Sequence, residues 1–216
     1  MNRFSPVSLP LALTALSVPV LVILAALVQP DAGVPPFVVR VALFALAGGA
    51  AYLFDDAAAQ LTSVTPPTLW RRRLLGLAGG AALLAGAWAG CLLVLGWQDS
   101  RPPIAVATFE LVLLCLVAGA CSAVLVQRGD PEPGARVAPA VLLLGTTVMI
   151  AEPLLRTTIL LPWDGDGPDA ALVLAWAALG LLAAVVLLLA SRDPASPPAL
   201  VWVRSPRRRS KDSGSA

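Results

Sequence analysis

The stretch AALVLAWAALGLLAAVVLLLA, residues 170–190, contains no charged side chain. A helix of about 20 residues spans ~30 Å, which is the thickness of the hydrocarbon core of a bilayer. Outward from this stretch, the 216-residue chain repeats the pattern in apolar blocks of roughly 18 to 24 residues. The chain is 58% hydrophobic and 13% charged, whereas about a quarter of the residues in soluble domains are charged. The sequence therefore predicts an all-α, polytopic membrane helix bundle.

The apolar blocks predict a six-helix transmembrane domain at residues 1–190, followed by a tail at 191–216. This tail is rich in Pro, Ser and Arg, and we expect it to be disordered, basic and cytoplasmic. The first block is longer than the ~7–15-residue core of a signal peptide, so we interpret it as a retained helix. The six expected helices span about residues 9–28, 37–54, 74–97, 104–126, 137–155 and 170–190.

Basic residues are distributed unevenly between the two sides of these helices. If the N-terminus is cytoplasmic, twelve of the Lys and Arg residues lie on the inner side and only Arg40, Arg101 and Arg156 on the outer side. Cytoplasmic loops of membrane proteins carry an excess of Lys and Arg. This asymmetry predicts a multi-pass plasma-membrane protein with both termini in the cytoplasm.

The chain lacks the residues that several kinds of binding and catalytic site require. There is no histidine, which excludes haem ligation by histidine, histidine-based zinc sites and Ser-His triads. Cys91, Cys115 and Cys121 lie within apolar blocks without a C-x-x-C pair, as buried thiols do. No G-x-S-x-G elbow and no G-x-x-x-x-G-K-[ST] phosphate-binding loop occurs. We expect no metal, no cofactor and no enzymatic activity, and the single basic cluster of the tail does not predict nucleic-acid binding.

Four charged residues fall within or beside the apolar blocks. A charge at mid-helix costs at least ~2.5–3.5 kcal/mol, so such residues usually pair with one another or have a function. Under the predicted topology all four lie in the outer half of the bilayer, and Glu152 and Arg156 share one helix face at the favoured i, i+4 spacing. They can form a polar clamp that holds helices together, or line an outward gate or substrate path. The four residues are Arg40, Glu110, Glu152 and Arg156.

The longest polar interruption before the tail is FDDAAAQLTSVTPPTLWRRR, residues 54–73. Asp55 or Asp56 can cap a short helix, and Leu61 and Val64, three residues apart, give that helix an apolar face. A double proline ends it, a tryptophan suits the membrane interface, and three arginines meet the anionic inner leaflet. The segment can be a membrane-skimming loop or a docking helix for a cytoplasmic partner. The candidate coupling residues are Asp55, Asp56, Leu61, Val64, Trp70, Arg71, Arg72 and Arg73.

Two further patterns concern packing. The third block contains Gly76 and Gly80, and Gly86 and Gly90, each pair at the small-xxx-small spacing that allows close approach of helices. The segment 156–169 is too apolar at its start for an ordinary loop. Its ILLPW part, residues 159–163, can form a short re-entrant or interfacial segment with the tryptophan at headgroup level.

Taken together, six helices, two cytoplasmic termini, a short cytoplasmic helix after the second span and an apolar outer segment after the fifth resemble the six-helix export type of ABC-transporter permease. The stretch LFDDAAAQLTSVTPPTLWRRR, residues 53–73, also resembles a segment of ABC-transporter membrane proteins of actinobacteria. The Ala-, Arg- and Pro-rich composition fits a high-GC genome of that kind.

The resemblance implies that the chain is a membrane-spanning permease subunit that works as a homodimer in the lipid bilayer. Residues 55–73 would be the coupling segment that seats in a groove of a separate cytoplasmic ATPase subunit, and the outer segment would cap the pathway. The alternative is a non-transporting structural or accessory membrane protein, in which the four intramembrane charges only hold the helices together.

Overall fold

The computed structural model of the chain describes residues 9–28, 34–55, 69–97, 103–130, 132–155, 159–161 and 169–190. Within these ranges all regular structure is helical, and six helices are long and apolar enough to cross a membrane. The predicted all-α bundle of six membrane-spanning helices is therefore confirmed.

The helices follow the apolar blocks of the sequence, with two earlier starts. The third helix begins at Leu69, not at 74, and the fifth at Pro133, not at 137. The first turn of the third helix contains arginines, which are good helix formers, and the fifth helix starts with a proline, which suits the first helical position. Both first turns are therefore helical although they lie outside the apolar blocks. The elements are α1 (Leu9–Val28), α2 (Pro36–Ala51), η1 (Tyr52–Phe54), α3 (Leu69–Gly96), α4 (Ile104–Gln127), α5 (Pro133–Leu155) and α6 (Ala170–Ala190).

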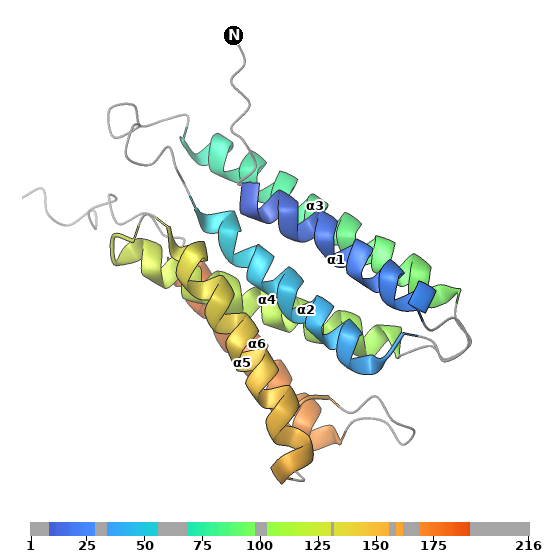
Figure 1. Ribbon diagram of the computed structural model, residues 1–216. Coiled ribbons are helices and arrows are strands. Elements are labelled where there is room, and N and C mark those ends of the chain that lie inside the picture. Colours follow the sequence, from blue (N-terminus) through green and yellow to red (C-terminus); the bar gives the residue numbers. More distant parts are fainter. Residues whose placement is uncertain are drawn as a thin grey trace, which may run out of the picture.

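Helix α2 lies at the centre of the bundle. It packs against α1, α3, α4 and α5, and its side chains Val39, Leu43 and Leu46 are fully buried. Figure 1 shows α1 and α3 on one side of α2 and α5 on the other. Helix α6 packs on α4 and is the least buried of the six spans. The core is therefore built around α2 and α4, while α5 and α6 present most of their apolar side chains outward.

The small residues of α3 contribute unequally to its packing. A side chain at Gly80 would collide with the side chain of Leu53, so α3 approaches η1 closely there. Gly90 faces Pro19 of α1 at ordinary contact distance, whereas Gly86 is exposed and has open space around it. Gly80 and Gly90 thus lie on the face of α3 that packs against α1 and η1, whereas Gly86 does not.

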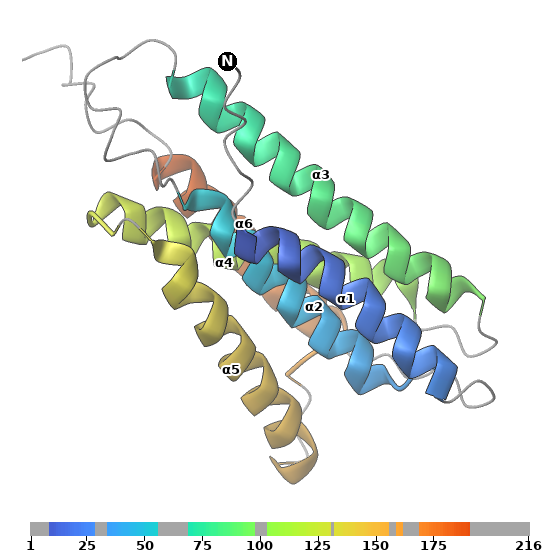
Figure 2. The same ribbon diagram turned by 45° about the horizontal axis from the view of Figure 1, so that its top comes forward.

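Alternation of the helices gives the bundle two ends (Figures 1 and 2). The end where α2, α4 and α6 finish and α1, α3 and α5 start is called here the Asp55 end. The opposite end, near the start of α2, is called the Arg40 end. At the Asp55 end the Gln127 side-chain amide donates a hydrogen bond to the carbonyl of Ala190 (2.9 Å), which ties α4 to α6.

Candidate functional site

An ion pair joins two of the four predicted intramembrane charges at the Arg40 end. The Nη1 atom of Arg40, in the second turn of α2, lies 3.2 Å from Oε2 of Glu152, near the end of α5. The two side chains are 17% and 14% exposed, respectively. Partial burial weakens solvent screening, so this pair is stronger than one on an open surface.

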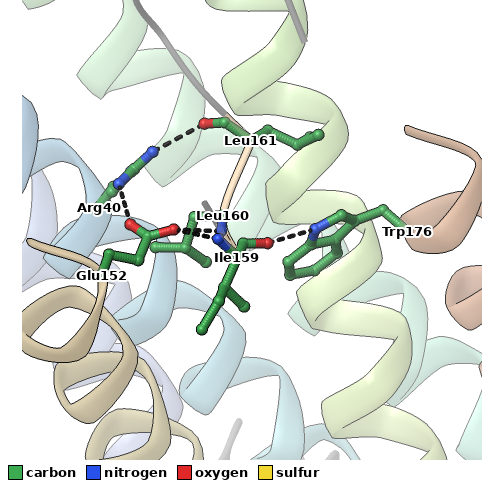
Figure 3. A network of polar contacts seen from close by, with 6 residues as sticks. All are labelled: Arg40, Glu152, Ile159, Leu160, Leu161 and Trp176. Carbon is green, nitrogen blue, oxygen red and sulfur yellow. Dashed lines mark hydrogen bonds and ion pairs between the residues drawn. The ribbon is translucent and has the colours of Figure 1, made fainter. Parts of the chain in front are cut away.

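The same two side chains hold the backbone of residues 159–161, the described part of the segment 156–169 (Figure 3). Oε1 of Glu152 accepts hydrogen bonds from the backbone N–H of Ile159 (2.7 Å) and of Leu160. Nη2 of Arg40 donates to the carbonyl of Leu161 (2.8 Å). The indole N–H of Trp176, on α6, donates to the carbonyl of Ile159 (3.0 Å).

Together these contacts hold the non-helical segment 159–161 in place, as a clamp does. Backbone polar groups that lie away from water must find partners within the protein, and here two charged side chains and one indole provide them. Leu160 and Leu161 are buried at the same place. The clamp therefore fixes α2, α5 and α6 relative to one another through a short stretch of non-helical chain. We name it the outer clamp, after the side on which the predicted topology places it: Arg40, Glu152, residues 159–161 and Trp176.

The other two predicted intramembrane charges are Glu110 and Arg156. Glu110, in the second turn of α4, is fully buried, with 0% exposure. A carboxyl group removed from water to this extent is costly and marks a polar position inside the core of the bundle. Arg156 and its predicted contact with Glu152 lie outside the described residues.

At the Asp55 end, the first residue of the predicted coupling segment caps a distant helix. Oδ1 of Asp55, directly after η1, accepts a hydrogen bond from the backbone N–H of Gly134 at the start of α5 (2.7 Å). Carboxylates are favourable there because the first N–H groups of a helix have no partner within it. A side chain at Gly134 would collide with Tyr52 and Asp55, so only glycine allows this close approach.

The turn between α4 and α5 supports this contact. Gly129 adopts a positive φ of 86°, which lets the chain reverse after α4. Oδ2 of Asp130 then pairs with Nη1 of Arg136 in the first turns of α5 at 3.0 Å. Burial raises the pKa of Asp55, the hydrogen bond from Gly134 opposes this shift, and the charges of Glu132 and Asp130 add to it. The start of α5 is thus a compact acidic cluster around one helix N-terminus.

Replacing Asp55 tests this cap. We expect Asp55→Ala to lower the free energy of unfolding by about 1 kcal/mol, because the N–H of Gly134 loses its acceptor. Asp55→Asn keeps an oxygen acceptor and has no charge, so it should be at least as stable as wild type at pH 7. The melting temperature in detergent at several pH values measures both effects.

The sign of the pH dependence follows from the raised pKa. A raised folded-state pKa contributes stability below the ordinary value of 3.8, and this contribution is lost as the pH rises through the folded-state pKa. Wild type should therefore lose stability relative to Asp55→Asn as the pH rises from about 3.5 towards 7. A difference between the two proteins that does not vary with pH would contradict this assignment.

The remaining predicted coupling residues are only partly described. Asp56, Leu61 and Val64, and with them the predicted short helix, lie outside the described residues. The backbone of Trp70 and of the three arginines, residues 71–73, lies in the first turns of α3 and not in a loop before it. Among the described residues, no group of three or more His, Cys, Asp or Glu side chains could hold a metal ion.

Sequence reasoning missed three participants in these contacts. Trp176 lies in an apolar block, where nothing distinguishes a lipid-facing tryptophan from one that donates a hydrogen bond inward. Gly134 and Asp130 belong to the hydrophilic stretch 128–136, RGDPEPGAR, whose Gly and Pro residues signal a reversal of the chain but not the contacts made there. The structure adds all three to the candidate sites.

The chain was compared with known proteins at the level of families, sequences and folds. No family model, no curated protein and no solved structure matches it. Functional inference therefore depends on the contacts of the chain itself.

Proposed function

We propose that the chain is the membrane-spanning permease subunit of an ABC-type export system, driven by a separate cytoplasmic ATPase subunit. The observation that carries this proposal is the contact between Asp55 and Gly134. It attaches the start of the α2–α3 connection to α5. A force on that connection would therefore act on α2, α3 and α5 together.

Helix α5 extends this mechanical link across the bundle. Its first turn holds Asp55, and near its other end Glu152 holds Arg40 and the segment 159–161. Movement of the α2–α3 connection by the ATPase would tilt α5 and load the outer clamp. In this proposal the clamp is the outward gate, and its opening and closing would alternate access to the interior.

The partner follows from what the sequence lacks. Phosphate binding by such ATPases uses a G-x-x-x-x-G-K-[ST] loop, and the chain contains none, so ATP would be hydrolysed by another polypeptide. The Asp55 end would face the cytoplasm of the plasma membrane, because the predicted inner side carries twelve of the fifteen basic residues. Both termini would lie on that side, and a second copy of the chain would complete the permease.

A non-transporting accessory protein is the second candidate, favoured by the outer clamp itself. Both carboxylate oxygens of Glu152 are used within the chain, and Arg40 contacts both Glu152 and the carbonyl of Leu161. A clamp whose charged groups all have partners within the chain can serve only to stabilise the bundle. The two candidates differ in whether an ATPase binds at the Asp55 end.

Co-purification separates these two functions. We expect the chain, isolated from its native membrane in mild detergent, to bring down a P-loop ATPase. Replacing Leu61, Val64 and Trp70 together with alanine should reduce the recovered ATPase about tenfold or more, because apolar and tryptophan anchors dominate such interfaces. Leu143→Ala, on the exposed face of α5, is the matched control and should leave recovery unchanged. Absence of any ATPase, or full recovery with the triple variant, would reject the permease proposal.

A further inference from the structure

An apolar groove lies between α4 and α6 in the half of the bundle nearer the Asp55 end. Its volume is about 420 Å³, within the ~300–1,000 Å³ of small-molecule sites in proteins. Carbon and sulfur atoms make almost all of its surface. The side chains that define it are Val117, Cys121 and Val124 of α4 and Leu179, Leu182 and Val186 of α6.

Two contacts between α4 and α6 bound the groove. On the side towards the Arg40 end, Gly180 of α6 is so close to Leu113 of α4 that any added side chain would collide. At the Asp55 end, the hydrogen bond from Gln127 to Ala190 joins the two helices again. The two helices are in contact at both positions, and the groove between them is shallow and open on its outer side.

The groove lies along the half of α4 nearer the Asp55 end, and an exposed arginine follows its lining residues on the same stripe. Val117, Cys121, Val124 and Arg128 recur at helical spacing, so they form one stripe along α4. Arg128 caps the end of α4, and its side chain is exposed. From Val117 to Arg128 the helix rises about 16 Å, roughly half of the ~30 Å hydrocarbon core.

We propose that this groove binds one acyl chain of a phospholipid whose anionic headgroup contacts Arg128. An apolar groove and the exposed arginine that follows it, together about 16 Å along α4, match the acyl chain and the anionic headgroup of such a lipid. A transmembrane helix of a second copy would run through both leaflets, whereas the groove-lining residues cover only about half of α4 and α6. The site is independent of the proposed transport function, since it uses neither the Asp55 contact nor the outer clamp.

Native mass spectrometry of the full chain in detergent tests the site. The probes are phosphatidylglycerol and phosphatidylcholine with identical acyl chains, added at matched concentrations. We expect wild type to retain one phosphatidylglycerol per chain in preference to phosphatidylcholine. Cys121→Trp fills the groove and should weaken retention about tenfold or more, because added side-chain volume competes with the acyl chain. Arg128→Gln should reduce the preference for the anionic lipid about fivefold.

Leu143→Trp is the matched control, because it places the same side chain on an exposed face of α5, away from the groove. It should bind both lipids as wild type does. Equal retention by wild type and Cys121→Trp would overturn the proposal, and so would equal affinity of wild type for the two lipids. A lipid-free dimer that dissociates in Cys121→Trp would instead assign the groove to a second copy. Arg128→Gln leaves the packing of the groove intact, so its result stands even if Cys121→Trp fails to fold.

Discussion

Arg40→Met is expected to lower the free energy of unfolding by about 3–5 kcal/mol, because it leaves the Glu152 carboxylate partly buried without its cation. The variant also removes the hydrogen bond to the carbonyl of Leu161. The expected loss is larger than for a surface pair, since both side chains are less than a fifth exposed. Equilibrium unfolding in mixed micelles, monitored by circular dichroism, measures it.

A double-variant cycle identifies the source of this loss. Glu152→Gln keeps a side-chain oxygen that can accept from Ile159 and Leu160, so the double variant with Arg40→Met has no charge at this site and can retain both hydrogen bonds. The double variant should be more stable than Arg40→Met alone, with a coupling energy of at least about 1 kcal/mol. Simple additivity of the two changes would show that the charges do not interact.

A second ion pair tests whether burial of the carboxylate determines this loss. Arg136 pairs with Asp130 at 3.0 Å; the Arg136 side chain is 72% exposed, but the Asp130 side chain is only 7% exposed. Arg136→Met also leaves a buried carboxylate without its cation, so it should cost about 3 kcal/mol or more. A loss below about 1 kcal/mol would mean that exposure of the arginine, and not burial of the carboxylate, determines the strength of these pairs.

The fold could be predicted from hydropathy because each span must bury its backbone polar groups in a helix and its apolar side chains in lipid. The spans 9–28 and 170–190 have the same bounds in sequence and structure. Hydropathy failed at Leu69 and Pro133, where helices begin with polar turns, because helix formation and membrane burial are different requirements. Length and composition set the spans, while propensity and capping set the ends.

Two charged residues of the candidate site were predictable, but its other participants and most of its contacts were not. The cost of a charge in hydrocarbon singled out Arg40 and Glu152, and they are paired. The sequence could not indicate that the backbone of residues 159–161 would complete the clamp, because backbone groups are identical in every residue. Asp55 was predicted to cap a short helix that would follow it, and its described partner is Gly134 of α5. Spacing along the chain reveals local caps but not caps between distant helices.

Close packing of α5 against α2 is a further contact that spacing did not reveal. Gly145 of α5 lies against the ring of Phe44 of α2, which is buried. A Cβ atom at Gly145 would lie 2.5 Å from Cδ1 and 2.6 Å from Cδ2 of that ring, far inside van der Waals contact. Gly145→Leu must therefore displace a buried aromatic ring or move the two helices apart, and we expect it to cost about 3 kcal/mol or more. The same micelle unfolding assay measures this loss.

Two further variants decide whether the ring is the obstacle. Gly86→Leu adds the same side chain to α3 at an exposed position, where an added Cβ atom would meet nothing within 4 Å beyond the backbone of its own helix, so it should be close to neutral. Phe44→Ala alone should cost about 3–5 kcal/mol through the cavity it leaves. In the double variant with Gly145→Leu, the new leucine can fill that cavity. The double variant should therefore lose less stability than the sum of the two single losses. Strict additivity would mean that the leucine collides with something other than Phe44, and the assigned α2–α5 contact would then be wrong.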